Sequence, residues 1–130
     1  SRPVLACFGN PVCHLGPLGS GQRAKLINNA LMAAHFGTAR DAIRLGQQLG
    51  IDPDALGAVL EQGSGRSFAL STYLLSRSMP EIAPQIRPLL RKDVDILSAL
   101  CTDAGADPGM LVAMADHSVV QLEAEGAADR

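Results

Sequence analysis

Apolar residues recur at helical spacing through most of this chain. Between about residues 22 and 49 they fall three and four positions apart, which is the pattern of one face of a helix. Gly37 and Gly46 interrupt the pattern only weakly, and Gly50 ends it. The spacing predicts a single helix over 22–49, which is long for a globular protein. Its apolar positions are Leu26, Ala30, Ala33, Ala34, Ile43, Leu45 and Leu49.

Capping residues predict two shorter helices after it. Asp52-Pro53 places a capping side chain before a proline at the first helical position, so a helix should run from there to about Gln62. Gly63 should end this helix. Ser67 is predicted to begin another helix that reaches about residue 77.

Three prolines interrupt the middle of the chain. Pro80, Pro84 and Pro88 lie four residues apart, and a proline inside a helix removes a backbone hydrogen bond. We therefore expect a loop here, with at most one turn of structure around 81–86. A fourth helix is predicted over about 89–104.

The last helix is predicted from Asp107-Pro108, a second cap followed by proline, and should end near Glu123. Residues 125–130 should fray. No alternating strand pattern follows residue 16, so residues 17–130 are predicted to be an all-α domain with one long central helix. Residues 1–16, which contain a short apolar run over 12–15, are predicted to be the exit segment of a preceding domain.

Composition narrows the class of protein. Of the 130 residues, 47% are hydrophobic but only 3% are aromatic, so the core must be built from aliphatic side chains. A net charge of −2 gives no broad basic surface for nucleic acid. No apolar run reaches the roughly 20 residues that span a membrane. The odd set of Cys7, Cys13 and Cys101 favours reduced thiols and a cytoplasmic location. Cys13 beside His14 lacks a second ligand pair at zinc spacing, so no metal site is predicted.

The candidate chemistry lies at the start of the long helix. Glycines at positions 16, 19 and 21 permit a positive φ and close approach of a ligand, and Ser20 is expected to cap the helix. Arg23 and Lys25 then occupy the first turns, where the helix dipole is positive and acidic residues are preferred. Two basic side chains near the positive end of the helix dipole are electrostatically unfavourable.

Lys25 is the candidate general acid/base. A lysine that is partly buried at a positive helix end exchanges its proton more readily near neutral pH. Asn29 lies one turn later on the same face, where it can orient the amine or hold a substrate hydroxyl, and Asn28 lies on an adjacent stripe. Asparagine is unfavourable inside helices, so two in succession suggest hydrogen-bonding partners. The alternative is that Lys25 and both asparagines simply face solvent.

The stretch from Gly16 to Asn29 resembles the catalytic motif of the β-hydroxyacid dehydrogenases, the family that includes 3-hydroxyisobutyrate dehydrogenase and tartronate semialdehyde reductase. The resemblance implies that Lys25 is the catalytic acid/base and that Asn29 contacts the substrate. Segment 91–94 (Arg-Lys-Asp-Val) looks like a second motif of this family, a lysine-aspartate pair at the start of a helix. It implies that Lys92 reaches the cofactor near its nicotinamide end.

The resemblance also implies a fold and an activity. The chain is expected to be the helical domain of an enzyme of the 6-phosphogluconate dehydrogenase-like superfamily, which transfers a hydride between NAD or NADP and a small β-hydroxyacid or its semialdehyde. The family's dinucleotide-binding domain carries G-x-G-x-x-G and binds most of the cofactor, and this sequence contains no such unit. The chain alone is therefore expected to be inactive. In this family the helical domain also forms the dimer interface, which implies a homodimer or a larger assembly.

A different class of function remains as the alternative, a free-standing helical oligomerisation or binding module without catalysis. Lys25, Asn29 and Lys92 argue against it, because such a module needs none of them. Small residues along the long helix allow another helix to approach closely, either from a second copy or from the same chain. They are Ala24, Ala30, Ala33, Ala34, Gly37 and Ala39.

Other candidate residues are weaker. The polar loop 64–66, which includes Arg66, either contacts a ligand or simply ends a helix, and the second reading is favoured. His35 and His117 have no partner at a useful spacing, and we assign them no role. Asp93 is interpreted as an acidic residue at a helix N-terminus rather than as a catalytic group.

Overall fold

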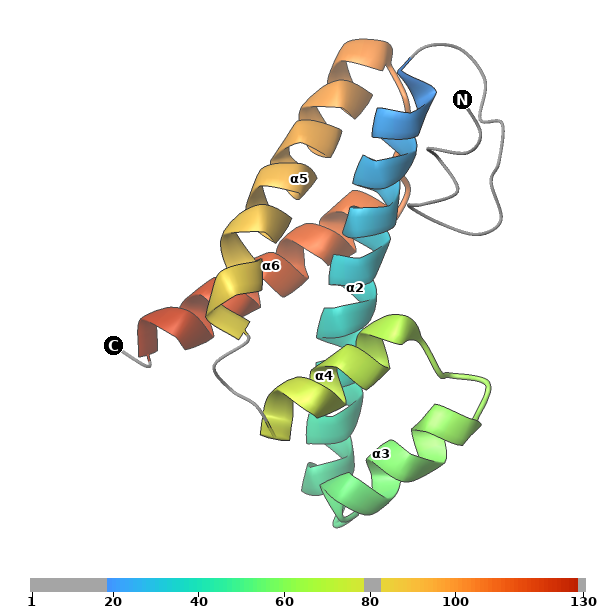
Figure 1. Cartoon of the computed structure of the whole chain (residues 1–130), viewed down its shortest axis with the longest axis vertical. Helices are drawn as coiled ribbons and strands as arrows, with labels where there is room; N and C mark the ends of the chain where they lie inside the picture. The colour runs from blue at the N-terminus through green and yellow to red at the C-terminus, as the bar shows by residue number, and fades with distance from the viewer. Residues whose placement is uncertain (1–18, 79–82, 129–130) are drawn as a thin grey trace, which may run out of the picture.

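The computed structural model describes residues 19–78 and 83–128, which form a bundle of helices (Figure 1). No strand occurs among these described residues, so the all-α prediction is confirmed. Residues 1–18, which contain the predicted exit segment, Cys7, Cys13 and His14, lie outside the described residues. The helices are α2 (Ser20–Gln48), α3 (Pro53–Gln62), α4 (Phe68–Ser78), α5 (Ala83–Ala104) and α6 (Leu111–Ala128).

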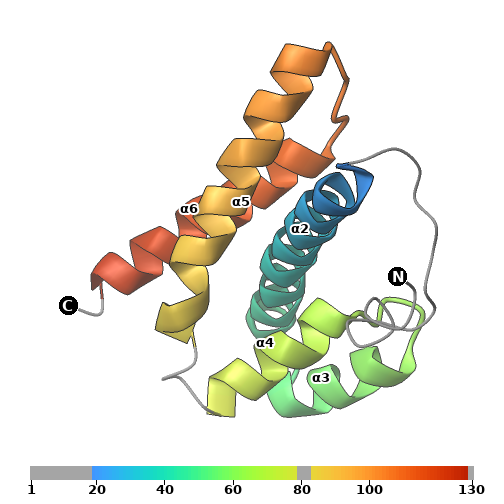
Figure 2. The same ribbon diagram turned by 45° about the horizontal axis from the view of Figure 1, so that its top comes forward.

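Helix α2 is the central element, and it contacts each of the other four helices. The helices α3 and α4 lie toward its C-terminal end, whereas α5 and α6 pack along the remainder (Figures 1 and 2). The main core lies between α2, α5 and α6 and is aliphatic, as the composition predicted. Its buried residues include Leu26, Ala30, Ala33, Leu90, Val94, Leu97, Ala115, Val119 and Leu122.

A small residue lets α6 cross α2 at close range. Gly37 is buried, and a Cβ added there would lie 2.6 Å from the Cβ of Ser118 and 3.2 Å from its Cα. Ala30, Ala33 and Ala34 on the same helix are buried within the chain as well. The small residues of α2 predicted close approach of another helix, and the structure shows that this helix is α6 of the same chain.

The capping predictions for α3 and α4 are confirmed. The Asp52 carboxylate accepts a 2.9 Å hydrogen bond from the backbone N–H of Ala55, and Pro53 is the first residue of α3. The Ser67 hydroxyl accepts a 3.0 Å hydrogen bond from the backbone N–H of Leu70. Each side chain satisfies an N–H group that has no acceptor inside its helix.

The predicted cap of α2 is wrong. Ser20 is the first helical residue, and Gly19 occupies the cap position with φ of +93° and no side-chain hydrogen bond. This left-handed backbone favours glycine because a Cβ would be strained there. The glycine-rich turn therefore acts through backbone conformation rather than through a capping hydroxyl.

The predicted loop across the prolines is also wrong. Helix α5 begins at Ala83 and continues through Pro84 and Pro88. Pro84 is the second helical residue, where N–H groups have no acceptor within the helix, so its missing N–H removes no hydrogen bond. Pro88 removes one bond a turn later, and burial of Val94 and Leu97 farther along α5 outweighs that loss. Pro80 lies outside the described residues.

The last helix is displaced from its predicted range at both ends. The Asp107 carboxylate accepts a 2.8 Å hydrogen bond from the backbone N–H of Gly109, whose φ is +58°. This turn is not helical, so α6 begins at Leu111 rather than Pro108. Helix α6 then continues to Ala128, which corrects both the predicted end near 123 and the predicted fraying of residues 125–128.

A buried arginine holds the end of α6. The Arg40 side chain is 6% exposed, and its Nη1 donates a 2.7 Å hydrogen bond to Glu125 Oε1. Its Nη2 lies 3.5 Å from Asp41 Oδ1, and its Nε is buried without an acceptor among the described residues. A buried guanidinium is costly without a counter-ion. Glu125 therefore belongs to the fold, which explains why the helix does not end at 123.

A second arginine joins α5 to α6. Arg91 donates 2.7 Å hydrogen bonds to Asp116 and Glu123 on α6, and a 3.1 Å bond to Asp95 on its own helix. The bonds to Asp116 and then Glu123 raise the pKa of the Arg91 guanidinium above its usual value.

Within residues 19–78 and 83–128, no helix has both the length and the apolar character that a membrane crossing requires.

Candidate functional site

The candidate acid/base Lys25 and the candidate substrate-binding residue Asn29 lie on the first half of α2. Lys25 and Asn29 are one helical turn apart and share a face. The Lys25 side chain is exposed, so the partial burial expected from the sequence is not found within the described residues. Its ammonium forms no ion pair with a described carboxylate. The amine is therefore accessible to a ligand approaching α2.

Asn29 has the partner that its position inside a helix suggested. Its Nδ2 donates a 2.6 Å hydrogen bond to Asp93 Oδ2 on α5, and both side chains are partly buried. Asn28 Nδ2 approaches Asn29 Oδ1 at 3.4 Å, a much weaker contact. A hydrogen bond to a charged acceptor is worth about 1.5–3 kcal/mol, and partial exposure puts this one at the lower end. Asp93 thereby fixes the rotamer of Asn29.

Helix α5 brings the second lysine to the same part of the fold. Lys92 precedes Asp93 and is exposed, and it forms no ion pair among the described residues. Because α5 begins at Ala83, this lysine-aspartate pair lies inside the helix and not at its start. The interpretation of Asp93 as a residue at the helix N-terminus is therefore wrong. The two motifs singled out in the sequence meet through Asn29 and Asp93.

A pocket of about 330 Å³ opens beside Asn29, between α2 and the first turn of α4. We call it the Asn29 pocket. Leu31, Met32, Phe68 and Ala69 give it apolar walls, and polar groups come from α2. Its full lining is Asn28, Asn29, Leu31, Met32, His35, Phe68 and Ala69. No sequence pattern predicted this pocket, because α2 and α4 contribute residues almost 40 positions apart, such as Asn29 and Phe68.

Two further pockets lie elsewhere in the described part of the fold. One of about 410 Å³ is formed with the loop 64–67 and is lined by His35, Thr38, Arg66 and Ser67 among others. Arg66 donates a 3.1 Å hydrogen bond to the carbonyl of Gly63, so it stabilises the turn that ends α3. This contact agrees with the favoured reading of that loop as a helix stop.

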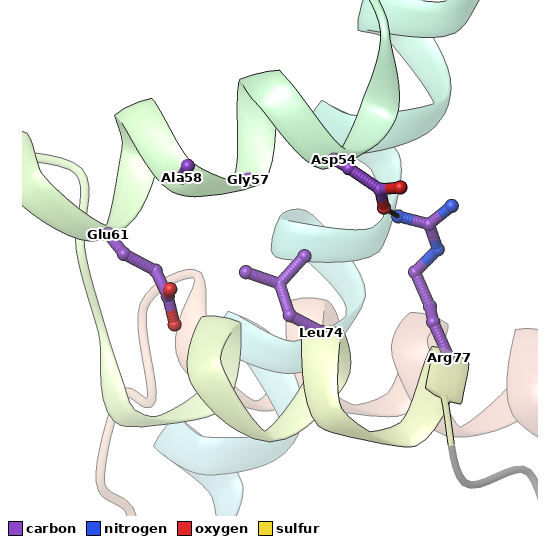
Figure 3. A pocket seen from close by; sticks show the side chains of 6 residues that line it. All are labelled: Asp54, Gly57, Ala58, Glu61, Leu74 and Arg77. Atoms are coloured by element: carbon purple, nitrogen blue, oxygen red, sulfur yellow. Dashed lines mark ion pairs between the residues drawn. The ribbon is translucent and has the colours of Figure 1, made fainter.

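The third pocket, of about 330 Å³, lies between α3 and α4 (Figure 3). Asp54 and Arg77 form a 3.6 Å ion pair at one side of it, and Glu61 lies at the other. The Asp54 side chain is 91% exposed, so the pair contributes at most about 1 kcal/mol. Gly57 keeps the pocket open against Leu74. None of the candidate site residues lines it.

Histidines and potential metal ligands do not form a centre in the described part of the chain. No group of three His, Cys, Asp or Glu side chains gathers there at metal-binding range. His117 is exposed, and His35 is exposed at the junction of two pockets. Cys101 is a half-buried free thiol.

Comparison with known proteins gives a match over nearly all of the described chain. A family model described as "NAD-binding of NADP-dependent 3-hydroxyisobutyrate dehydrogenase" matches residues 19–130. This range begins at the glycine that precedes α2 and includes all five helices. It therefore contains both lysine motifs.

Individual relatives agree with the family match. The chain is 35% identical over 122 residues to an uncharacterized oxidoreductase of Synechocystis, a match that covers 92% of this chain. It is 38% identical over 85 residues to 3-hydroxyisobutyrate dehydrogenase of Pseudomonas aeruginosa, covering 65% of this chain. It is also 38% identical over 73 residues to the human mitochondrial 3-hydroxyisobutyrate dehydrogenase, covering 56%.

The relatives are much longer than the region they share with this chain. The matched regions make up 41%, 28% and 22% of the Synechocystis, Pseudomonas and human proteins. The chain thus spans less than half the length of these curated relatives. No solved structure gives a significant match to it.

Proposed function

The chain belongs to the 3-hydroxyisobutyrate dehydrogenase family, and from this premise we propose that it is the helical domain of an NAD(P)-dependent oxidoreductase acting on small β-hydroxyacids or their semialdehydes. The observation that carries the proposal is the 2.6 Å bond between Asn29 and Asp93. It links the face of α2 that presents Lys25 to the part of α5 that presents Lys92. A binding module without chemistry has no need of this arrangement.

Lys25 is proposed as the general acid/base. As a substrate alcohol is oxidised, its carbon loses a hydride and its hydroxyl loses a proton, which the neutral Lys25 amine accepts. In the reverse direction, the Lys25 ammonium donates that proton to the oxygen of the semialdehyde. The nicotinamide, when bound, supplies the hydride acceptor or donor.

Asn29 is proposed to hold the substrate in position for Lys25. Its Nδ2 has two hydrogens, and only one is used in the bond to Asp93. The second hydrogen of Nδ2 is available to be donated to a substrate hydroxyl or carboxylate. Oδ1 can accept a hydrogen bond from a substrate hydroxyl. Because Asp93 holds the amide in one rotamer, Asn29 binds substrate with little further loss of conformational freedom.

Lys92 is proposed to contact the cofactor. Its exposed ammonium fits an interaction with a carbonyl or phosphate group of a dinucleotide, and no described carboxylate competes for it. Most of the cofactor-binding surface is proposed to lie in a dinucleotide-binding domain outside this chain. The chain alone is then inactive. Reading the coding DNA upstream of Ser1 for G-x-G-x-x-G would test the position of that domain.

A homodimer or larger assembly is also proposed, on the family resemblance. The small residues of α2 do not supply its interface, because most of them are buried inside the chain. Exposed apolar side chains elsewhere, such as Val59 and Met110, are available to do so. Sedimentation of the full-length protein as a clean monomer at high concentration would contradict this part of the proposal.

The decisive experiment replaces Lys25 in the full-length protein. Lys25→Ala should lower turnover by at least about a hundredfold while nicotinamide cofactor binding stays near that of the parent. Arg23→Ala is the matched control, since Arg23 is an exposed basic residue on the same turns of α2 and lies on nearly the opposite face. Turnover of Lys25→Ala within about tenfold of the parent would refute the assignment and favour the binding module.

A further inference from the structure

The loop that joins α3 to α4 (Figure 1) closes one side of the pocket of about 410 Å³ that Arg66 lines, which we call the Arg66 pocket. We propose that the Arg66 pocket binds a small organic anion, a short alkyl group that ends in a phosphate or a carboxylate. This site is separate from the proposed reacting centre at Lys25, and its existence does not depend on the proposed function.

Helix α2 gives the Arg66 pocket a wall on a different face from Lys25. His35, Thr38, Ala39 and Ala42 line this wall, and their spacing of three and four residues places them on one face of the helix. At about 100° and 1.5 Å per residue, the middle of this face is rotated by about 90° from Lys25, and Thr38 lies about 20 Å along the axis from it. A small molecule in the pocket therefore leaves the reacting centre free.

Arg66 supplies the positive charge of the site. Its Nη1 donates a 3.1 Å hydrogen bond to the carbonyl oxygen of Gly63, which holds the guanidinium beside the loop. That bond uses one of five guanidinium N–H groups, so Arg66 can stabilise the end of α3 and still bind a ligand. Arg66 forms no ion pair with a carboxylate in the described part of the chain, and no Asp or Glu is among the residues that line the pocket. The site thus carries a positive charge that an anion can neutralise.

The loop beside Arg66 supplies further hydrogen-bond donors. The backbone N–H groups of Ser64 and Gly65, both exposed residues, have no acceptor within the described ranges. The Ser67 hydroxyl accepts the N–H of Leu70, so its own proton remains available for donation. Ser67 also precedes the first residue of α4, where the helix dipole is positive. Backbone N–H groups beside a guanidinium and a helix N-terminus are a favourable setting for an anion.

The remaining lining of the Arg66 pocket is apolar, which indicates that the anion carries a carbon chain. Ala39, Ala42, Leu60 and Leu70 supply this apolar surface. Thr38 offers no donor, because its hydroxyl proton is directed to backbone carbonyl oxygens of α2. An inorganic ion would leave the apolar surface in water, whereas an alkyl group covers it. The volume of about 410 Å³ is at the lower end of the range for ligand pockets, which suits a chain of a few carbon atoms.

The other two pockets described above lack this combination of groups. The pocket between α3 and α4 is lined by two carboxylates, Asp54 and Glu61, and its Arg77 is already paired with Asp54. The Asn29 pocket contains no arginine or lysine. Among these three pockets, a guanidinium without a carboxylate partner occurs in the Arg66 pocket alone.

Isothermal titration calorimetry of the full-length protein at low salt tests the site, with butyl phosphate, butyrate and inorganic phosphate as the ligands. We expect saturable binding of at least one of the two alkyl anions. Inorganic phosphate should bind at least about fivefold more weakly than the tighter alkyl anion, because it cannot cover the apolar surface. Absence of saturable binding by both alkyl anions would overturn the proposal, and so would an affinity for inorganic phosphate equal to that of the tighter one.

Replacement of Arg66 shows whether its guanidinium holds the anion. Arg66→Gln should weaken binding of the tighter alkyl anion at least about tenfold. Arg44→Gln is the matched control, since Arg44 is exposed on nearly the opposite face of α2 from Ala42 and forms no ion pair with a described carboxylate. It removes the same charge from the protein and should leave the Kd within about twofold of the parent. Equal weakening by both variants would mean that the anion responds to net charge alone, against the proposal.

A second pair of variants makes the test independent of the turn that Arg66 stabilises. Ala42→Asp places a carboxylate in the wall of the pocket, and Ala42→Asn places a neutral group of nearly the same size there. Ala42 is exposed, so both variants should fold. Ala42→Asp should bind the anion at least about tenfold more weakly than Ala42→Asn, because like charges repel. Similar affinities of the two variants would place the anion outside the Arg66 pocket.

Lys25→Ala separates the Arg66 pocket from the proposed substrate site. An anion in the Arg66 pocket should keep its Kd within about twofold in this variant, because Lys25 is on another face and about 20 Å away. An alkyl anion that loses affinity in Lys25→Ala but not in Arg66→Gln binds as a substrate analogue, which overturns the second site and leaves the proposed function intact. A full-length protein that binds the anion through Arg66 yet has no dehydrogenase activity retains this site and loses the proposed function.

Discussion

Asn29 and Asp93 are separated by 64 positions in the sequence, yet a 2.6 Å hydrogen bond joins their side chains. It is a polar link between α2 and α5 beside the apolar core that these two helices share with α6. The bond holds the amide of Asn29 in a single orientation. It therefore connects the stability of the domain to the geometry of the candidate site.

This bond should be measurable as a coupling energy. Asn29→Ala and Asp93→Ala should each lower the free energy of unfolding by about 1–2 kcal/mol. The double variant should lose about 1 kcal/mol less than the sum of the two, because the second replacement removes an interaction already lost. Urea unfolding of the three variants and the parent gives the cycle. Strictly additive losses would mean that the two side chains do not interact in solution.

The sequence predicted the elements whose signals are local. Asp52, Pro53 and Ser67 placed the starts of α3 and α4 because a cap acts on N–H groups only two or three residues away. The face shared by Lys25 and Asn29 followed from helical periodicity alone. These features need no knowledge of the rest of the chain.

The sequence failed where distant contacts decide the outcome. Pro84 and Pro88 indicated a loop, but α5 extends through them because its later turns are buried against α2 and α6. Glu125 was expected to fray, and its role is visible only once Arg40 is placed opposite it. The Asn29 pocket requires Phe68 beside α2, a relationship that no spacing rule contains.

Arg91 should stabilise the contact between α5 and α6. Arg91→Met should lower the free energy of unfolding by about 1–2 kcal/mol, since its three carboxylate partners are each more than half exposed. Arg91→Lys keeps the charge but cannot make several directed bonds at once, so it should recover only part of the loss.

The contribution of Arg91 to the free energy of unfolding should fall as the sodium chloride concentration is raised, because salt screens these partly exposed ion pairs. Urea unfolding at low and high salt measures it. Equal stability of the parent and Arg91→Met at low salt would show that the cluster contributes nothing net.

Tyr73 should make stability depend on alkaline pH. Burial raises the pKa of the Tyr73 phenol above its ordinary 10.0, and it outweighs the opposing charges of Arg77 and Arg40. The folded state therefore keeps the proton at a pH where the unfolded state has lost it. The contribution of Tyr73 to the free energy of unfolding is complete below pH 10. It declines as the pH rises from 10 through the folded-state pKa of the phenol.

The measurement for Tyr73 is direct, because it is the only tyrosine and the chain has no tryptophan. Phenolate absorbance during a pH titration should give a midpoint above 10 in the folded protein and near 10 in urea. Tyr73→Phe keeps the edge-to-face contact with Phe36 at 5.6 Å and should lose the alkaline slope in stability. A folded-state midpoint at or below 10 would contradict the effect of burial.

Gly37 should tolerate no side chain. Gly37→Ala places a methyl group against Ser118 where α2 and α6 cross, and it should lower the free energy of unfolding by about 1–3 kcal/mol. Gly21→Ala is the control on the same helix, since nothing lies within 4 Å of an added Cβ there, and it should be neutral or stabilising. The two variants can be compared by thermal unfolding. Similar melting temperatures would show that α6 can move away from α2 without cost.

The Arg40–Glu125 pair limits how far helix α6 can be shortened from its C-terminal end. A protein ended just before residue 125 would retain most of α6 but leave the Arg40 guanidinium without its 2.7 Å counter-ion. Because the Glu125 side chain is 46% exposed, the expected loss is about 1–3 kcal/mol, below that for a fully buried pair. Recombinant versions shortened to residue 124 should therefore be less stable than the parent and express poorly. The C-terminal turn of α6 is a boundary that any engineering of this domain has to respect.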